Sequence, residues 1–442
     1  MSKAITPTLL KSFAAQSHDS QLTVMQRAVT KNGIYAASES NILSATNTTI
    51  FSDEIETGSV TDQKQSGRCW LFAELNTIRH QIVKDFKLDD LELSQSYSYF
   101  WDKLEKSNSF FERIIETADK PVDDRWVTRF FEWPQGDGGW WEYAVSVIEK
   151  YGVVPSNVMP EAITTSESHQ LNTVLDLHLR KGGLALRKLV ADKKSDAEIQ
   201  KAKETMLAGV YRLLTIAIGT PPQSFDFVYK DKDKKYHRDT ATTPVKFLKK
   251  YYKKSFDDYV VILNDPSPSK VYLQTYEFQH GGNVVDGLDI RWLNLDMQSL
   301  KDLTYAQIKK GETVWFGCDV GTDTNKKGFM SLDTYDFNGT FGIDFSLSKA
   351  ERLESRDSSV THAMTITGVD VVDDTPAQWK VENSWGDERG FKGYYTMSND
   401  WFDKNGYVVV IRKELLTETQ QKALEKPAIM IPEWDPLNTM PN

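Results

Sequence analysis

Cysteine is scarce in this sequence, with only Cys69 and Cys318 among 442 residues. Two thiols cannot build the disulfide framework of a small secreted domain, and such scarcity is typical of a reducing compartment. Long apolar runs are missing too, since none approaches the roughly 18 residues of a membrane span. Residues 1–20 lack the hydrophobic core and the cleavage pattern of a signal peptide. We therefore expect a cytoplasmic protein that contacts no membrane.

The chain also has no surplus of positive charge, because its formal net charge at pH 7 is −10. This balance argues against general affinity for nucleic acid. Residues 230–254 run against the balance, with ten Lys or Arg against three Asp. A solvated surface is the ordinary explanation of such a segment. The alternative is a basic lining that attracts carboxylates or phosphates.

Internal repeats and low-complexity tracts are absent as well, and hydrophobic residues make up 40% of the chain, enough for a large core. Residues 69–150 and 169–218 have the patterns of helices. Within the second range, Ser195 and Glu198 form an S-x-x-E pair, which predicts the start of a helix that ends at Gly219.

The pattern changes at Gly311 to short β-rich runs separated by Gly, Asp and Asn, which predicts antiparallel sheet. Just before this point, Thr304 and Gln307 predict the start of a short helix. A helical first part followed by a β-rich last part predicts an α+β protein.

One of the two cysteines stands directly before a predicted amphipathic helix. Apolar residues recur from Leu71 at steps of four, three and four, so Cys69 should lie in the first helical turn. The unpaired N–H groups and the helix dipole at such a position favour the thiolate, which is the nucleophilic form. Cys318 lies instead within the apolar segment VWFGCDV, where we expect core packing.

A nucleophilic cysteine requires an imidazole within hydrogen-bonding distance and a group that orients this imidazole. Among the seven histidines, His362 lies at the start of a strand-like segment, and Asn383 ends the next such segment. Consecutive strands can bring these ends side by side. His80 lies too far along the Cys69 helix to reach back to the thiol. We therefore predict that Cys69, His362 and Asn383 act together.

The segments QKQSGRCWLFA, HAM and NSWG resemble the signatures of papain-type cysteine peptidases. The resemblance implies that Cys69 is the nucleophile and His362 the general base and acid, with Asn383 orienting the imidazole. It also implies that Gln63 and the N–H of Cys69 form an oxyanion hole. By the same resemblance, Trp385 shields the Asn–His hydrogen bond from water.

A second part of the resemblance concerns the substrate cleft. Gly138 and Gly139, in GDGGW, stand where that family has a Gly-Gly run beside the substrate backbone. Ser66 replaces the disulfide cysteine of the papain pattern. The His lies 293 residues after the Cys, about twice the spacing in papain-type peptidases, so a large insertion must separate them.

An expanded, disulfide-free relative is similar to the bleomycin hydrolase and bacterial aminopeptidase C family. The phrases SGRCWLFA, LSQSYSYFWDKLEK, EKYGVVP, VWFGCDV, HAMTITGVD and VENSWG carry this resemblance over nearly the whole chain. It implies a hexameric barrel with active sites facing an inner cavity, peptide substrates and no cofactor. The implied fold is papain-like and two-lobed, with a helical lobe and an antiparallel β lobe. We expect an N-terminal extension at 1–60, the helical lobe at 61–160, a mainly helical insertion at 161–310, the β-rich lobe at 311–430 and a C-terminal tail at 431–442.

The tail bears on specificity, because in that family a tail containing W-D-P enters its own cleft. Trp434, Asp435 and Pro436 are present here, followed by an ending that differs from the family's small residues. The resemblance implies that the tail blocks the non-primed side and that the Asn442 carboxylate pairs with a substrate's α-amino group.

Three functions stay open at this point. The resemblance favours a thiol aminopeptidase that trims peptides from the N-terminus. An endopeptidase with an open cleft is the second possibility. The third, from another class, is a compartment-forming assembly that binds nucleic acid or anions, although binding alone would not require a nucleophile.

Overall fold

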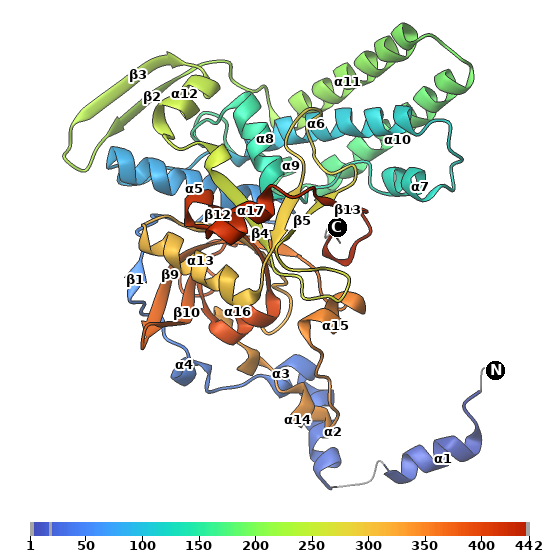
Figure 1. Ribbon diagram of the computed structural model, residues 1–442, viewed down its shortest axis with the longest axis vertical. Coiled ribbons are helices and arrows are strands. Elements are labelled where there is room, and N and C mark those ends of the chain that lie inside the picture. The colour runs from blue at the N-terminus through green and yellow to red at the C-terminus, as the bar shows by residue number, and fades with distance from the viewer. Residues whose placement is uncertain (1–3, 17–19, 439–442) are drawn as a thin grey trace.

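The computed structural model describes residues 4–16 and 20–438. Helices gather in an upper lobe and strands in a lower one, and an N-terminal arm projects below the strands (Figure 1). This arrangement confirms the predicted α+β fold with a helical lobe and a β-rich lobe. The helices of the upper lobe are α5 (Cys69–Phe86), α6 (Gln95–Glu116), α7 (Arg125–Glu132), α8 (Trp141–Tyr151), α9 (Ile163–Ser166), α10 (His169–Ala191), α11 (Asp196–Ile218) and α12 (Pro244–Tyr251).

The lower lobe is built on an 11-stranded sheet formed by the described residues. Most strand pairs are antiparallel, as predicted, and the pairs β4–β6, β5–β13 and β8–β11 are parallel. The strand order is β13-β5-β6-β4-β12-β7-β9-β10-β11-β8, and β1 pairs with β9. The strands are β1 (Asp53–Glu54), β4 (Tyr259–Leu263), β5 (Gln274–Phe278), β6 (Arg291–Asn294), β7 (Val314–Cys318), β8 (Phe329–Met330), β9 (His362–Val372), β10 (Thr375–Glu382), β11 (Tyr394–Ser398), β12 (Gly406–Arg412) and β13 (Ile429–Ile431).

Helix α5 lies between the two lobes. It packs against α6 and α8 of the helical lobe and against β7 and β9 of the sheet. The apolar face predicted from Leu71 onward is buried here, and Ile78 and Ile82 on that face are fully buried. The first residue of this central helix is therefore held at the junction of the lobes.

The sheet begins earlier in the chain than the sequence suggested. Strands β4, β5 and β6 lie before residue 311, within the range predicted to be a mainly helical insertion. A hairpin of β2 (Phe225–Lys230) and β3 (Tyr236–Thr242) lies there too. The run YVVIL of β4 is almost wholly buried and has no alternation of polar and apolar residues, so it carries no periodic strand signal. The predicted boundary at 311 is therefore wrong for the sheet.

Two helix starts test the capping patterns. Ser195 and Glu198 form a reciprocal capping box at the start of α11, and Gly219 ends that helix, as predicted. The start predicted at Thr304 is wrong, because α13 (Met297–Lys309) begins earlier, with Asp296 accepting a hydrogen bond from the N–H of Ser299 at 2.9 Å. Thr304 lies inside the helix and donates to a backbone carbonyl one turn back.

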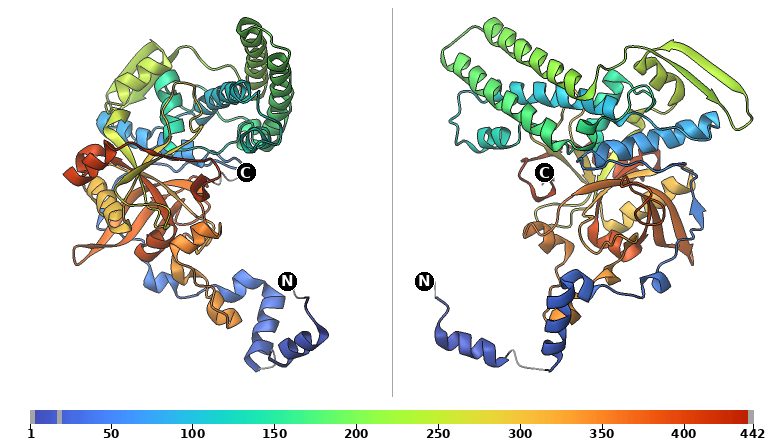
Figure 2. Two further views of the ribbon diagram at one scale, coloured as in Figure 1. Left: turned by 45° about the vertical axis from the view of Figure 1, so that its right-hand side comes forward. Right: turned by 180° about the vertical axis from the view of Figure 1, so that it is seen from behind.

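The N-terminal extension forms the arm that projects from the sheet lobe (Figure 2). Helices α2 (Ser20–Asn32) and α3 (Ile34–Ser38) pack against α14 (Phe337–Phe341), and Ser38 and Thr340 share a buried 2.8 Å hydrogen bond. Helix α1 (Pro7–Gln16) extends beyond them and buries none of its residues. None of the helices within residues 4–16 and 20–438 has both the length and the hydropathy needed to cross a bilayer. The remaining helices are α4 (Leu43–Thr46), α15 (Lys349–Glu354), α16 (Asn399–Asn405) and α17 (Glu418–Leu424).

Candidate active site

Cys69 is the first residue of α5, so the structure places the thiol where the sequence predicted it. The preceding residue, Arg68, is fully buried and donates two hydrogen bonds to the Glu161 carboxylate, at 3.0 and 2.8 Å. Its Nε also donates to Ser66 Oγ at 2.9 Å. The loop that leads into Cys69 is thus fixed by a bidentate ion pair whose arginine is buried and whose carboxylate is partly exposed.

His362 and Asn383 come together because antiparallel strands β9 and β10 place the start of one beside the end of the other. His362 Nε2 lies 2.9 Å from Asn383 Oδ1, which also accepts the N–H of Ser384 at 2.8 Å. An amide oxygen only accepts, so Nε2 carries the hydrogen and Nδ1 is the basic nitrogen of the neutral ring. The Trp385 ring stacks on the imidazole, with centroids 4.8 Å apart and planes at 28°.

Cys69 and His362 line one cavity of about 140 Å³ at the lobe junction. Gly138 and Gly139 line the same cavity, as expected for residues beside a substrate backbone. A Cβ on Gly139 would lie 2.6 Å from the Trp70 ring, so this position requires glycine. The structure therefore brings together four residues that the sequence analysis selected from distant segments.

Burial dominates the protonation of the Cys69–His362 pair. It raises the pKa of the Cys69 thiol to about 11, although the N–H groups of Ala363 and Trp70 act in the opposite direction. Burial also lowers the pKa of His362 to about 4, against the effect of the Asn383 hydrogen bond. Desolvation thus opposes the expected preference for a thiolate at the helix N-terminus and favours a neutral thiol beside a neutral imidazole.

Gln63 lies beside the cysteine loop and is buried. Its Nε2 donates to the Ser66 carbonyl at 2.7 Å, and its Oε1 accepts from Ser384 Oγ at 2.6 Å. The Gln63 N–H also donates to the Ser384 carbonyl at 2.8 Å. The two bonds to Ser384 hold Gln63 to the turn after Asn383. An amide nitrogen has two hydrogens, so the Ser66 carbonyl uses only one of those on Gln63 Nε2.

Asp137 is a residue that the sequence analysis did not single out, although it lies within GDGGW. Partial burial acts to raise the pKa of the Asp137 carboxyl, but the Lys103 ammonium, 2.8 Å away, and a set of hydrogen bonds outweigh it and hold this pKa well below its usual range. Its backbone carbonyl also accepts the Trp70 indole N–H at 2.6 Å. The donors to its side chain are Lys103, Tyr99, Asn172, Ser168 and the N–H of Gly67.

A larger cleft of about 570 Å³ adjoins the cavity of Cys69 and His362, and Gly67 and Gly138 line both. Two residues of the C-terminal tail, Glu433 and Asn438, line this cleft as well. The tail therefore enters the cleft as far as Asn438. The predicted substrate-binding residue Asn442 lies outside the described residues.

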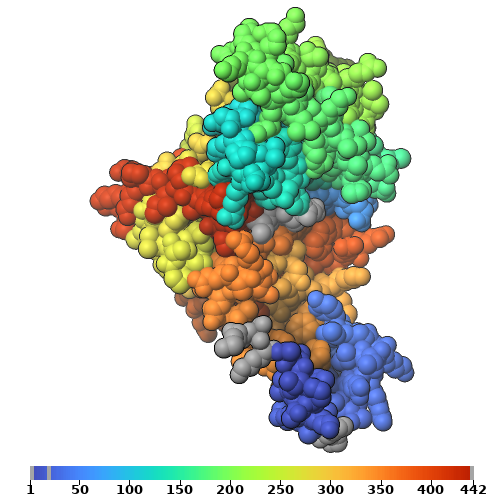
Figure 3. Space-filling model, turned by 90° about the vertical axis from the view of Figure 1, so that its right-hand side faces the viewer, coloured from blue at the N-terminus to red at the C-terminus, as the bar shows by residue number. Residues whose placement is uncertain are grey.

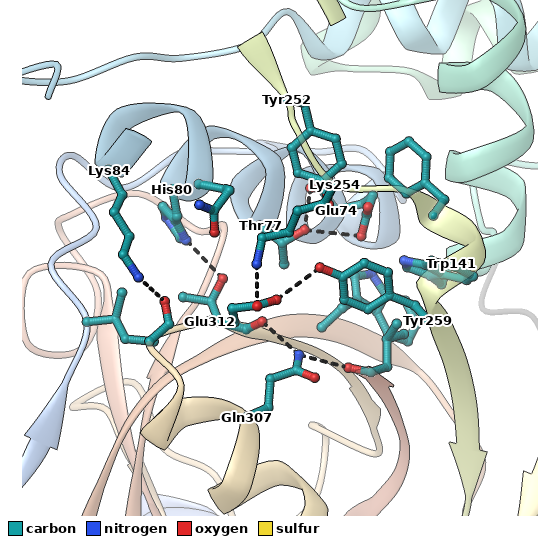
Figure 4. A pocket seen from close by; sticks show the side chains of 17 residues that line it. Glu74, Thr77, His80, Lys84, Trp141, Tyr252, Lys254, Tyr259, Gln307 and Glu312 are labelled. Carbon is teal, nitrogen blue, oxygen red and sulfur yellow. Dashed lines mark hydrogen bonds and ion pairs between the residues drawn. The ribbon is translucent and has the colours of Figure 1, made fainter. Parts of the chain in front are cut away.

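A second, smaller cavity of about 30 Å³ lies beside α5, lined by Glu74, His80 and Glu312 among others (Figure 4). Glu312 accepts a 3.0 Å hydrogen bond from the Tyr259 hydroxyl and pairs with Lys254. This cavity has room for about one or two water molecules, and of its lining residues only Trp315 also lines the cavity of Cys69 and His362. No group of three His, Cys, Asp or Glu within 4–16 and 20–438 is placed to hold a metal ion.

Known proteins were compared with the chain. The sequence profile of the peptidase C1-like family matches residues 4–438. Aminopeptidase C of Lactobacillus delbrueckii subsp. lactis is 46% identical, covering 100% of this chain and 99% of that relative. Aminopeptidase C of Listeria innocua serovar 6a is 43% identical over 100% of both chains. The crystal structure of pepw from Lactobacillus rhamnosis HN001 is 47% identical and similar at a TM-score of 0.97, covering 99% of this chain and 100% of that one.

Proposed function

Because the chain belongs to the peptidase C1-like family and is a cysteine aminopeptidase like its full-length relatives, we propose that it works through Cys69, His362 and Asn383. The single observation that carries this proposal is the Asn383–His362 hydrogen bond, which leaves the basic Nδ1 for the thiol in the shared cavity. The scarcity of cysteine supports a cytoplasmic enzyme.

The proposed reaction begins from the neutral pair. His362 Nδ1 accepts the thiol proton as Cys69 Sγ attacks the carbonyl carbon of the first peptide bond. The carbonyl electron pair moves to oxygen, where the free Nε2–H of Gln63 and the Cys69 N–H stabilise it. The C–N bond then breaks, and the imidazolium gives its proton to the leaving amine.

The second half of the proposed reaction releases the N-terminal residue. His362 removes a proton from water, and the hydroxide attacks the thioester carbon of the acyl-enzyme. The C–S bond breaks, and the proton held on the imidazole returns to the thiolate. No external oxidant, reductant or cofactor enters this balance.

The tail supports exopeptidase over endopeptidase action. A cleft occupied as far as Asn438 has less room for substrate residues before the scissile bond. Amino-acid amides and N-acylated peptides of the same sequence should be assayed side by side, and we expect cleavage of the free-amine substrates only. Equal cleavage of both would favour the endopeptidase alternative. The pairing of an Asn442 carboxylate with the amine stays a prediction.

The N-terminal arm supports assembly into a homo-oligomer, for which a hexamer is the proposal. Helix α1 buries none of its residues, and Ile5 and Leu10 of the arm expose more than half of their surface. Apolar side chains held away from the body of the molecule gain by packing on another copy. Light scattering at micromolar concentration should give about six times the monomer mass. A monomer mass would contradict this proposal.

The basic segment gives less support to the anion-binding alternative than its composition suggests. Five of its ten Lys and Arg side chains form ion pairs with carboxylates. Ions already paired attract a polyanion less strongly. The five are Lys232, Lys234, Arg238, Lys250 and Lys254.

A further inference from the structure

Three consecutive side chains of the C-terminal tail bind partners on both lobes. We name Glu433, Trp434 and Asp435 the latch. The chain reaches the latch through β13, which pairs with β5 at the edge of the sheet. Within the latch the side chains diverge, and each of them contacts a different set of partners.

The first two latch residues bind the helical lobe. Glu433 pairs with Arg129 Nε at 3.3 Å and with Arg113 Nη1 at 3.6 Å. The Trp434 ring lies under the Arg125 guanidinium, 3.9 Å from its centroid, and 4.7 Å from the Trp126 ring. Stacking on an aromatic face suits arginine, and such a contact gains strength as water is excluded.

The third latch residue binds the sheet lobe. Asp435 Oδ2 lies 2.9 Å from Lys270 Nζ, in the loop between β4 and β5. Lys270 is also 3.2 Å from Asp265, and its side chain is 5% exposed. Burial would lower the pKa of Lys270, but the two carboxylates raise it, so the lysine stays cationic. Arg356 adds a 3.0 Å hydrogen bond to the Trp434 carbonyl.

The latch sets the direction of the chain that follows it. Asp435 accepts the Leu437 N–H on its side chain at 3.1 Å and the Asn438 N–H on its carbonyl at 2.9 Å. This turn buries Leu437 completely and leads Asn438 to the cleft. The space-filling view shows the C-terminal residues, in red, lying across the junction between the two lobes (Figure 3).

We propose that the latch and its partners Lys270, Arg125 and Arg129 determine specificity by keeping the tail in the cleft. This inference rests on the proposed exopeptidase function and names the contacts that enforce it. None of these residues touches the reacting atoms. Breaking a latch contact should therefore admit N-blocked peptides without removing the catalytic chemistry.

The test compares two substrates across a small set of variants. The readout is the kcat/KM for an amino-acid amide divided by the kcat/KM for an N-acetylated, internally quenched peptide. Lys270→Met and Asp435→Asn should each lower this ratio at least tenfold, because both remove the Lys270–Asp435 ion pair. The double variant should lower it no further than Lys270→Met, which also removes the pair with Asp265. Trp434→Ala should also lower the ratio, and its partly exposed side chain makes that variant the safer one to fold.

A matched control is Lys301→Met, since the Lys301 side chain is 8% exposed, close to the 5% of Lys270, and forms a 2.6 Å ion pair with Asp403, but lies on α13. Its ratio should equal that of the intact protein. An unchanged ratio in the latch variants, or an equal fall of the ratio in the control, would contradict the proposed role of the latch in specificity. If the intact protein already cleaves both substrates equally, the exopeptidase function itself fails, which is a distinguishable result.

Discussion

The two sides of the catalytic cleft are held in place by different forces. On the helical side, buried ion pairs join Lys103 to Asp137 and Lys106 to Asp102, each at 2.8 Å. On the sheet side, the imidazole is held by a neutral hydrogen bond and by a stacked tryptophan. Changes in side-chain charge or in pH should therefore affect mainly the stability of the helical side. Changes in strand register or packing should affect mainly the sheet side.

One charged cluster joins the two sides. Glu382 is the last residue of β10, directly before Asn383, and its carboxylate is buried. It pairs with Arg79 at 2.7 Å and with His80 at 3.1 Å, both on α5. The strand end that precedes Asn383 is thus tied to the helix that begins at Cys69. His80 has a structural partner here, which fits the expectation that it does not serve the nucleophile.

The largest effect should come from removing one reactive group on either side. Cys69→Ala and His362→Ala should each lower kcat/KM for an amino-acid amide by about 10⁴-fold or more, because the two groups act as a unit. Unfolding curves of both variants should stay close to that of the intact protein. Iodoacetamide should label Cys69 before Cys318, which is fully buried in the sheet. Labelling of Cys318 with activity retained would contradict the assignment.

Gln63 lies where the two sides meet and should give the next largest effect. Gln63→Ala should lower kcat by roughly 10²–10³-fold with a smaller change in KM, because the lost donor acts on the transition-state oxyanion. Steady-state kinetics on the same amide measure both constants. A change in KM alone would mean that Gln63 binds substrate instead.

Local signals predicted much of this site. The periodic stripe after Leu71 fixed the helix that begins at Cys69, and the strand-like segments placed His362 and Asn383 at neighbouring ends. These patterns involve residues that are close together in the chain, so they can be recognised without knowledge of the tertiary structure. The capping box at Ser195 is predictable for the same reason.

The remaining features depend on tertiary contacts. Lys103 on α6 and Asp137 in GDGGW are far apart in the sequence and pair only in the folded chain, which no spacing rule reveals. A helix N-terminus, which favours the Cys69 thiolate, is visible in the sequence, whereas the burial that raises the pKa of this thiol is not. Strand β4 was missed because buried strands lose the alternation that identifies them.

Neutralising the Asp137 carboxylate on the helical side should have a smaller effect on activity and a large effect on stability. Asp137→Asn leaves the Lys103 ammonium buried without its counter-ion, which costs about 3–5 kcal/mol of unfolding free energy. We expect kcat/KM to fall about tenfold, because the Gly67 N–H also loses a charged acceptor. Urea unfolding measures the first effect. Asp176→Asn is the control, since Asp176 lines the same cleft but its side chain is 19% exposed, against 10% for Asp137. An equal loss of stability in both variants would contradict the prediction.

The smallest effect on activity, which we expect to be none, should come from two buried glutamates of the helical side. Burial raises the pKa of Glu142 to about 8, although its own N–H and the Trp292 indole lower it. Burial likewise raises the pKa of Glu74 to about 8, against the effect of its hydrogen bonds from Thr77 and Trp141. Neither carboxyl touches the reacting groups.

The sign of the pH effect follows from these raised values. A carboxyl with a raised pKa in the folded state contributes its full stability below the unfolded pKa of about 4.5 and loses it as pH rises toward 8. The intact protein should therefore lose stability between pH 5 and pH 8, by an amount on the order of 2–4 kcal/mol per group. Glu142→Gln should flatten this decline in urea unfolding, whereas Glu204→Gln, at an exposed site on α11, should not. If the unfolding free energy of the two variants falls equally between pH 5 and pH 8, the buried Glu142 carboxyl does not cause the loss of stability.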